Sequence, residues 1–247
     1  MRRYAILTQG RSGSTYLRTV LDAHPQLVNF GEVLGEWTEA YKCERPREEA
    51  IGRYLASFFG RTPRLEEHVA ARGKDPDAIV GVGIKDFFFN IERRRASGFF
   101  LDNTDIAIVY LVRDNLLERH VSLLVQRMTG VDHSENPAPL TPLRLDPDAV
   151  VAGLDLLSRE RDFEQALVER LRCTHAVVDL RYDEYFACDG SIDRHNRRLF
   201  EFLGVEPLEI RGRFKKIVPR DLRAVVADYD ELCRRLRRTR YACYLLD

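Results

Sequence analysis

The sequence has few cysteines, and no two of them form a Cys-x-x-Cys pair. The five are widely spaced, at Cys43, Cys173, Cys188, Cys233 and Cys243. An odd number at such spacing argues against a disulfide framework and against a structural zinc site. Carboxylates spaced to hold a metal ion are also lacking, so we expect the protein to work without a metal.

Net charge and long apolar runs are lacking as well. The 39 basic residues balance the 39 acidic ones, so no basic tail is indicated and we expect no nucleic-acid partner. No apolar run approaches the length of a membrane span, and the N-terminus leads into a strand without an apolar signal segment. We therefore expect a cytoplasmic protein with no integral membrane segment.

What the sequence does contain is an alternation of apolar runs with helical segments. Four short runs are almost continuously apolar, and they are Tyr4–Thr8, Ile79–Ile84, Ile106–Val112 and Ala176–Leu180. Such runs predict strands that are covered on both faces, as in a parallel sheet. The segments with helical periodicity are Ala50–Phe59, Asn115–Met128, Pro147–Arg172, Ile192–Leu203 and Leu222–Leu236.

This order predicts an α/β fold, a three-layer P-loop-like arrangement with a central parallel sheet flanked by helices. At 247 residues the chain suits one such domain, so we expect a single domain over residues 1–247. Ligands bind beyond the carboxyl ends of strands in these sheets, which places Gln9–Thr15, Lys85 and Arg113 along one edge. The proline-rich segment Val131–Asp146 is interpreted as a lid or acceptor loop, or else as a segment without fixed structure.

Small residues dominate the segment between the first strand and the first helix. It consists of Gly10, Arg11, Ser12, Gly13, Ser14 and Thr15. Backbone N–H groups in such a turn, with a helix dipole behind them, form a cradle for a phosphate-like anion. The nucleotide-kinase loop G-x-x-x-x-G-K-[ST] needs a lysine before its hydroxyl residue, whereas here the cation is Arg11. This difference points away from ATP and toward another phosphorylated donor.

A second motif covers Ile108–Ser122. A buried strand delivers Arg113 to its carboxyl end, and the following helix carries Ser122 about two turns further on. An arginine and a hydroxyl held in this way can bind a phosphate through charge-assisted and neutral hydrogen bonds. The alternative is that Arg113 pairs with an acidic neighbour such as Asp114 and that Ser122 only fills a helix position.

Together, the two motifs resemble those of the sulfotransferases that use 3′-phosphoadenosine 5′-phosphosulfate (PAPS). In that family, an Arg/Lys-Ser-Gly-[ST]-[ST] turn wraps the 5′-phosphosulfate, and a strand ending in Arg with a helix bearing Ser binds the 3′-phosphate. His24-Pro25 and Arg181–Tyr185 resemble the bacterial and carbohydrate-type branches. The resemblance extends over most of the chain, with Lys42–Lys74 and Val131–Arg172 the least covered.

The resemblance implies a role for each residue of the motifs. Arg11 and the N–H groups of the turn would neutralise charge on the bridging oxygen, and Ser14 and Thr15 would bind the 5′-phosphate. Arg113 and Ser122 would bind the 3′-phosphate. Sulfuryl transfer moves a compact anionic group in line between two oxygens, so the protein mainly supplies positioning and charge stabilisation.

The acceptor hydroxyl has to lose its proton, so a general base is expected. Glu32 resembles the glutamate that supplies this base in some bacterial and carbohydrate sulfotransferases. Alternatively, it is an exposed loop carboxylate or a helix N-cap partner for the segment at Trp37. Asp86 is the second candidate, because a carboxylate beside the strand-end lysine serves some heparan-type enzymes.

Lys85 ends a predicted strand, where the family often has a lysine that contacts the sulfuryl or bridging oxygen. Phe87 stands where the cytosolic small-molecule branch has a histidine base, so that mechanism is not expected. The alternative is a surface pair of Lys85 and Asp86 beside an aromatic core plug.

Three further residues are assigned to the donor by resemblance. Lys215 and Lys216 loosely match a late basic loop that contacts the 3′-phosphate, and Tyr182 is expected near the adenine.

The sequence therefore predicts an enzyme that converts PAPS and an acceptor hydroxyl to a sulfate ester and adenosine 3′,5′-bisphosphate (PAP). A P-loop small-molecule kinase and a catalytically inactive nucleotide-binding relative stay open as alternatives. The acceptor is a small molecule, a glycan or a lipid-linked compound. Aromatic residues that either line an acceptor pocket or belong to the core are Trp37, Phe87, Phe88, Phe89, Phe99 and Phe100.

Overall fold

The computed structural model describes residues 1–219 and 221–245. The chain forms two compact units. Unit 1 contains Met1–Val112 and Phe163–Gly212, and unit 2 contains Arg113–Asp162 and Arg213–Asp247. The expectation of one functional domain over residues 1–247 stays a prediction.

Unit 1 is built on a parallel sheet. Within the described residues the sheet has five strands in the order β2-β3-β1-β4-β5. Their bounds are β1 Arg2–Thr8, β2 Leu27–Asn29, β3 Gly81–Phe87, β4 Ile106–Val112 and β5 Val177–Arg181. The four predicted strands are thus confirmed, with shifts of up to three residues at their ends. The sequence did not predict β2, because three residues are too few to show a period.

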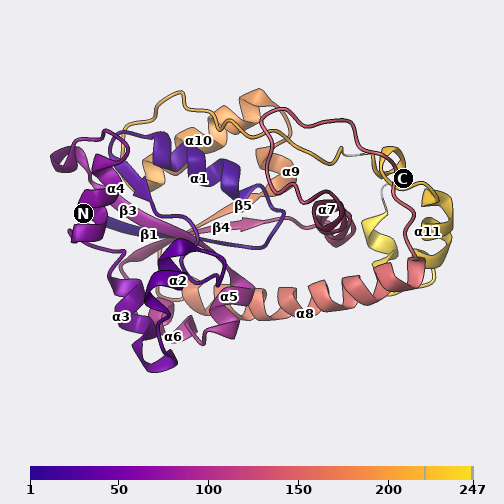
Figure 1. The fold of residues 1–247 in the computed structure, drawn as a ribbon, viewed down its shortest axis with the longest axis horizontal. Coiled ribbons are helices and arrows are strands. Elements are labelled where there is room, and N and C mark those ends of the chain that lie inside the picture. Colours follow the sequence, from indigo (N-terminus) through magenta and orange to yellow (C-terminus); the bar gives the residue numbers. More distant parts are fainter. Residues whose placement is uncertain (220, 246–247) are drawn as a thin grey trace. The chain divides into compact units, whose positions relative to one another are not determined.

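Helices cover both faces of this sheet (Figure 1). On one face, α1 (Ser14–Ala23), α9 (Tyr182–Tyr185) and α10 (Asp189–Leu203) pack against a cluster that includes Tyr4 and Ile6 of β1. Ala5 and Leu7, which alternate with these two residues along β1, point to the other face. Because successive side chains of a strand alternate between faces, β1 contributes to two cores, and the three-layer α/β fold is confirmed.

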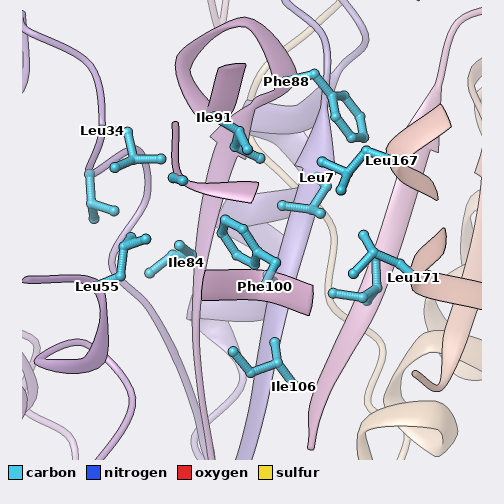
Figure 2. Close-up of a cluster of buried hydrophobic side chains, with 14 of the residues drawn as sticks. Leu7, Leu34, Leu55, Ile84, Phe88, Ile91, Phe100, Ile106, Leu167 and Leu171 are labelled. Atoms are coloured by element: carbon cyan, nitrogen blue, oxygen red, sulfur yellow. The ribbon is translucent and has the colours of Figure 1, made fainter. Parts of the chain in front are cut away.

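The second face carries the larger apolar cluster (Figure 2). It joins the sheet to several short helices and to the end of a long one, and its buried members include Leu55, Phe88, Phe100 and Leu171. The helices are α2 (Glu39–Glu44), α3 (Ile51–Ala56), α5 (Phe88–Arg93), α6 (Ser97–Asp102) and α8 (Pro147–Arg172). Helix α4 (Pro63–Ala70) packs in a smaller cluster with Val28 of β2 and Val82 of β3.

Helix α8 has the bounds that the sequence predicted, because its signals are local. The Asp146 carboxylate accepts a hydrogen bond from the backbone N–H of Asp148 at 3.0 Å, and Pro147 takes the first helical position. Helix α10 ends as predicted at Gly204, which has a left-handed φ of 74°.

Unit 2 contains α7 (Leu116–Thr129), the first part of α8, and α11 (Tyr229–Leu236). The predicted helix over Leu222–Leu236 was wrong in its first half. Residues Leu222–Ala224 form a 3₁₀ turn, and Val226 then pairs with Leu143 in an isolated bridge. This bridge requires an extended backbone, so the helix begins only at Tyr229.

Further 3₁₀ turns lie at Glu48–Ala50, Pro76–Ala78 and Arg240–Tyr244. The predicted helix over Ala50–Phe59 is correspondingly shorter, since α3 covers only Ile51–Ala56. Across the described residues, no helix combines the length and the apolar character that a membrane crossing requires.

Candidate functional site

The predicted donor loop directly follows β1 and leads into α1. Two of its residues have left-handed backbones, Arg11 with a φ of 65° and Gly13 with a φ of 77°. Gly13 is also the N-cap residue of α1. A left-handed conformation is uncommon for a residue other than glycine and costs on the order of 1 kcal/mol or more. Left-handed residues at two alternate positions of a turn are typical of the backbone that forms anion-binding nests.

Two aromatic rings cover Gly13. A Cβ atom at Gly13 would lie 2.5 Å from Cε2 of Phe186 and 3.3 Å from Cε2 of Tyr182. Glycine is therefore required here by space as well as by backbone conformation. Tyr182, which the sequence assigned to the adenine, contacts the donor loop within unit 1.

The Ser12 side chain is used inside the loop. Its hydroxyl donates to the carbonyl of Gln9 at 2.7 Å and lies 2.6 Å from the hydroxyl of Thr8. The Thr8 hydroxyl in turn donates to the carbonyl of Leu111 in β4 at 2.8 Å. Ser12 consequently fixes the loop to the sheet, and its predicted contact with a donor falls to its backbone N–H.

Gln9 had no predicted role, but its side-chain amide is buried without hydrogen-bond partners in the described part of the chain. Gln9 is 2% exposed, and neither its amide oxygen nor its amide nitrogen has a hydrogen-bond partner among the described residues. Leaving such a group unpaired costs about 1–3 kcal/mol. A buried amide that keeps both functions unsatisfied beside an anion cradle is suited to contact a bound ligand.

Glu32 lies at the centre of a small polar cluster in unit 1. The buried Lys85 ammonium donates to Oε1 of Glu32, and the indole N–H of Trp37 donates to Oε2 at 2.7 Å. The Glu32 side chain is 20% exposed, against 1% for Lys85. Burial lowers the pKa of Lys85 below its usual value, and the Glu32 carboxylate opposes this effect.

Glu32 is neither a fully exposed loop carboxylate nor a helix cap. The N-cap of α2 is Thr38, whose hydroxyl accepts from the N–H of Tyr41 at 3.3 Å. Glu32 instead faces Lys85 near the carboxyl end of β3, which is the edge that the sequence predicted for Lys85.

Asp86 is completely buried. One of its oxygens accepts from the N–H groups of Val33 and Leu34, at 2.9 and 2.7 Å. The other accepts from the N–H of Phe87 at 2.9 Å and from the amide of Asn90 at 2.7 Å. Burial raises the pKa of Asp86, and these donors oppose the rise.

These contacts show that Asp86 holds the segment that follows Glu32. The alternative of a surface pair between Lys85 and Asp86 is wrong, since both residues are buried and the ammonium contacts Glu32. On the other side of Glu32, the carbonyl of Gly31 accepts from the N–H of Lys85 at 3.0 Å. The backbone is therefore fixed to β3 both before and after Glu32.

The donor loop and the Glu32 segment follow β1 and β2, which lie on either side of β3 in the sheet. Thr8, the last residue of β1, pairs with Phe87 of β3. In addition, Arg18 of α1 lies against the segment, because a Cβ at Gly31 would be 3.3 Å from Cδ of Arg18. Sequence reasoning missed Arg18, although its position one helical turn after Ser14 was a usable signal.

Unit 2 holds the residues predicted to bind the 3′-phosphate. Arg113 donates to Glu118, one turn into α7, at 2.6 Å, and both side chains are buried. Asp114 pairs with Arg161 at 3.5 Å. Ser122 is buried on α7. Glu118 was not among the predicted site residues, although it lies in the first turn of a predicted helix, shortly after Arg113.

Lys215 and Lys216 are exposed in unit 2. The N–H of Lys215 donates to the carbonyl of Ser134 at 2.9 Å, and Arg213 pairs with Glu135 at 3.4 Å. The basic segment therefore runs beside the proline-rich segment Val131–Asp146, whose role as a lid or acceptor loop stays a prediction.

No group of three or more histidine, cysteine, aspartate or glutamate side chains that could hold a metal ion occurs in the part of the chain that the structure describes.

No protein-family model and no curated protein matches the sequence. Among solved structures, the chain is similar to one described as a sulfotransferase from Alicyclobacillus acidocaldarius. The two are 16% identical with a TM-score of 0.46, over 96% of this chain and 95% of that chain. At this identity and TM-score, the functional proposal depends on the residues of the site and not on the likeness.

Proposed function

We propose that the protein is a sulfotransferase that moves the sulfuryl group from PAPS to an acceptor hydroxyl, giving a sulfate ester and PAP. The observation that carries the proposal is the pairing of Lys85 with Glu32 at the carboxyl end of β3. Lys85 lies on β3, between β1 and β2, and Glu32 lies on the segment after β2. The loop after β1 has the left-handed residues Arg11 and Gly13. A cation, a carboxylate and an anion cradle are thus contributed by adjacent strands.

The loop suits the phosphosulfate end of the donor. Its N–H groups and the start of α1 favour an anion, and it lacks the lysine of kinase loops. Gly10 through Thr15 would bind the 5′-phosphosulfate through backbone N–H groups, the Arg11 guanidinium and the hydroxyls of Ser14 and Thr15. The unsatisfied amide of Gln9 offers a further donor to the same group.

The 3′-phosphate is assigned to Arg113 and Ser122 by the sequence motif, with Lys215 and Lys216 as further cations and Tyr182 near the adenine. The Arg113 guanidinium also donates to Glu118 at 2.6 Å, so a bound phosphate would share this cation with a buried carboxylate of the same sign of charge. We therefore expect this anchor to be weaker than an arginine without such a carboxylate beside it.

The chemistry follows from the position of each group. The acceptor oxygen forms a bond to sulfur as the bond from sulfur to the bridging oxygen breaks, and the hydroxyl proton passes to Glu32. Lys85 and Arg11 stabilise the charge that develops on the bridging oxygen. Glu32 is the proposed base because its carboxylate is partly exposed, whereas both oxygens of the buried Asp86 already accept two hydrogen bonds each.

The experiment is a transfer assay with ³⁵S-labelled PAPS and a mixed panel of phenols, sugars and aliphatic alcohols. We expect labelled sulfate ester from the native chain. Loss of a general base costs roughly 10²- to 10⁴-fold in rate, so Glu32→Gln is expected to bind PAP normally and to lose turnover by this factor. Glu66→Gln, on the exposed part of α4, is the matched control.

Two outcomes would overturn the proposal. PAP release with native rates in Glu32→Gln would exclude Glu32 as the base. Phosphoryl transfer from Mg-ATP, with no sulfated product from PAPS, would identify a kinase instead.

A further inference from the structure

Three aromatic side chains beside Glu32 and Lys85 stay outside the apolar clusters of the described chain. They are Trp37, Phe87 and Phe89. Their sequence neighbours differ, since Phe88 and Phe100 are buried in the core and Phe99 packs against it. The six aromatic residues that the sequence left undivided thus separate into a core set and a set outside the core, in which Trp37 is exposed and Phe87 and Phe89 are half-buried.

The rings of the set outside the core, Trp37, Phe87 and Phe89, form one continuous group. The rings of Phe87 and Phe89 are nearly parallel, with an angle of 14° and centroids 5.3 Å apart. The Trp37 ring lies 6.4 Å from that of Phe87 and 6.0 Å from that of Phe89. The ammonium of Lys85 lies 3.8 Å from the centre of the Phe87 ring. These three rings are called the aromatic platform.

Trp37 is held in place although it is 49% exposed. Its ring lies against Gly35, where a Cβ atom would be 2.6 Å from the indole carbons Cε2 and Cζ2. The turn is closed by the N–H of Thr38, which donates to the carbonyl of Gly35 at 3.0 Å. A large exposed aromatic side chain that is fixed by a glycine and by a hydrogen bond to Glu32 is a built feature rather than a chance exposure.

We infer that the aromatic platform binds the acceptor, and that the acceptor is an aromatic hydroxyl compound of the phenol class. This inference rests on the proposed function, since it assigns the substrate class of the same site. The ring of the acceptor stacks on Trp37, Phe87 and Phe89, and its hydroxyl donates to Glu32.

The polarity of the platform favours a phenol over a sugar. A sugar carries several hydroxyls, and each one that is desolvated without a partner costs about 1–3 kcal/mol. The only polar group on the three rings is the indole N–H, which already donates to Glu32. An aromatic ring buries apolar area and gains about 0.5–1.5 kcal/mol for each ring contact.

The hydrogen bond from Trp37 to Glu32 marks the place of the acceptor hydroxyl. Lys85 donates to Oε1 and Trp37 donates to Oε2. A carboxylate oxygen can accept more than one hydrogen bond, so the acceptor hydroxyl donates to Oε2 beside the indole N–H, and its proton passes to Oε2 as the bond to sulfur forms. Trp37 therefore acts as a positioning residue that keeps Glu32 turned toward the platform.

Trp37 is the single tryptophan of the chain, so its fluorescence reports on the platform directly. The test is a titration of the full chain with p-cresol, cyclohexanol or methyl β-glucoside, with and without PAP. Excitation is set at the red edge of indole absorption, where phenols do not absorb. We expect a saturable change of Trp37 emission with p-cresol, and little change with the other two compounds.

Phe89→Leu is expected to weaken p-cresol binding by about three- to tenfold, since one ring contact is lost. The matched control is Phe99→Leu, a half-buried phenylalanine whose ring stacks on Phe59 at 5.9 Å, and it is expected to bind p-cresol normally. Sulfation of p-cresol by the native chain, measured with labelled PAPS, is the expected second result.

An equal response to cyclohexanol, a response to the glucoside alone, or no response at all would overturn the acceptor assignment. Equal weakening by Phe89→Leu and Phe99→Leu would also overturn it. The proposed function is tested separately by PAP binding: a chain that binds PAP but not p-cresol contradicts only the acceptor class, whereas a chain that binds no PAP contradicts the function.

Discussion

At the scale of single residues, two carboxylates near Lys85 have opposite surroundings. Glu32 is partly exposed and accepts from Lys85 and Trp37, whereas Asp86 is buried and accepts from three backbone N–H groups and Asn90. Glu32 can accept a further hydrogen bond from a substrate, whereas Asp86 holds the backbone segment that carries Glu32. Asp86 is therefore a positioning residue in this account.

The substitution Asp86→Asn tests this role. An amide accepts at one atom only, so two of the four donors lose their partner and unfolding becomes easier by about 1–3 kcal/mol. We expect kcat to fall about tenfold while PAP affinity is retained, which steady-state kinetics and PAP titration would measure. Asp102→Asn, at an exposed position, is the control. Complete loss of turnover in Asp86→Asn, with activity intact in Glu32→Gln, would make Asp86 the base.

The sequence predicted that Lys85 lies at the sheet edge but not how it pairs. The end of β3 follows from an apolar run, whereas Glu32 was assigned by resemblance, since the short β2 before it was not predicted. The contacts of Trp37 with Glu32 and of Asp86 with Val33 depend on the course of the segment after β2, which no local pattern specifies. The sequence could have indicated Glu118 as the partner of Arg113, since both lie in one predicted strand–helix unit.

At the scale of elements, the donor loop depends on two left-handed residues between β1 and α1. The substitution Gly13→Ala is expected to lower the free energy of unfolding by about 1–2 kcal/mol, because alanine disfavours a φ of 77° and because its Cβ would meet Phe186. Stabilisation by PAP should largely disappear. Thermal unfolding with and without PAP measures both effects.

Gly190→Ala is the control for that substitution, because a Cβ at this position in α10 meets nothing within 4 Å. We expect it to leave both stability and the PAP response close to native. An unchanged PAP response in Gly13→Ala would mean that the loop is not the donor cradle.

Asp22 of α1 joins three elements of unit 1 and gives a prediction on pH. Burial alone would raise its pKa, but His68, the N–H of Asn29 and Arg72 together hold the pKa of Asp22 well below its usual 3.8. Because the folded pKa is depressed, this stabilisation is present above pH 3.8 and is lost as the pH falls below it. Asp22→Asn should therefore lower stability at pH 7 by about 1.5–3 kcal/mol.

Denaturant unfolding at pH 7 and at pH 3 would check this difference. The advantage of the native chain over Asp22→Asn should be smaller at pH 3 than at pH 7, because the loss begins near 3.8 and is complete only below the depressed folded pKa of Asp22. A constant difference at both pH values would show that the carboxylate charge has no part in joining α1, β2 and α4.

Elements with strong local signals were predicted closely, and elements set by tertiary contacts were not. Helix α8 has a cap at Asp146, a proline at its first position and a long apolar stripe. Strand β2 has only three residues, and the segment before α11 is drawn into a bridge between Leu143 and Val226. Neither pairing leaves a periodic trace in the sequence.

At the scale of the whole molecule, the predicted donor residues divide between two compact units. The phosphosulfate residues and Glu32 belong to unit 1, and Arg113, Ser122, Lys215 and Lys216 belong to unit 2. Binding of PAP is expected to stabilise the chain against unfolding by about 2.7 kcal/mol at a ligand concentration of 100 Kd.

The assignment of the loop after β1 to a PAPS donor is tested most directly by a calorimetric titration of the native chain with PAP and, in parallel, with Mg-ATP. We expect saturable binding of one PAP per chain and no binding of Mg-ATP, because the donor loop carries Arg11 in place of a kinase lysine. Binding of Mg-ATP without binding of PAP would contradict this assignment.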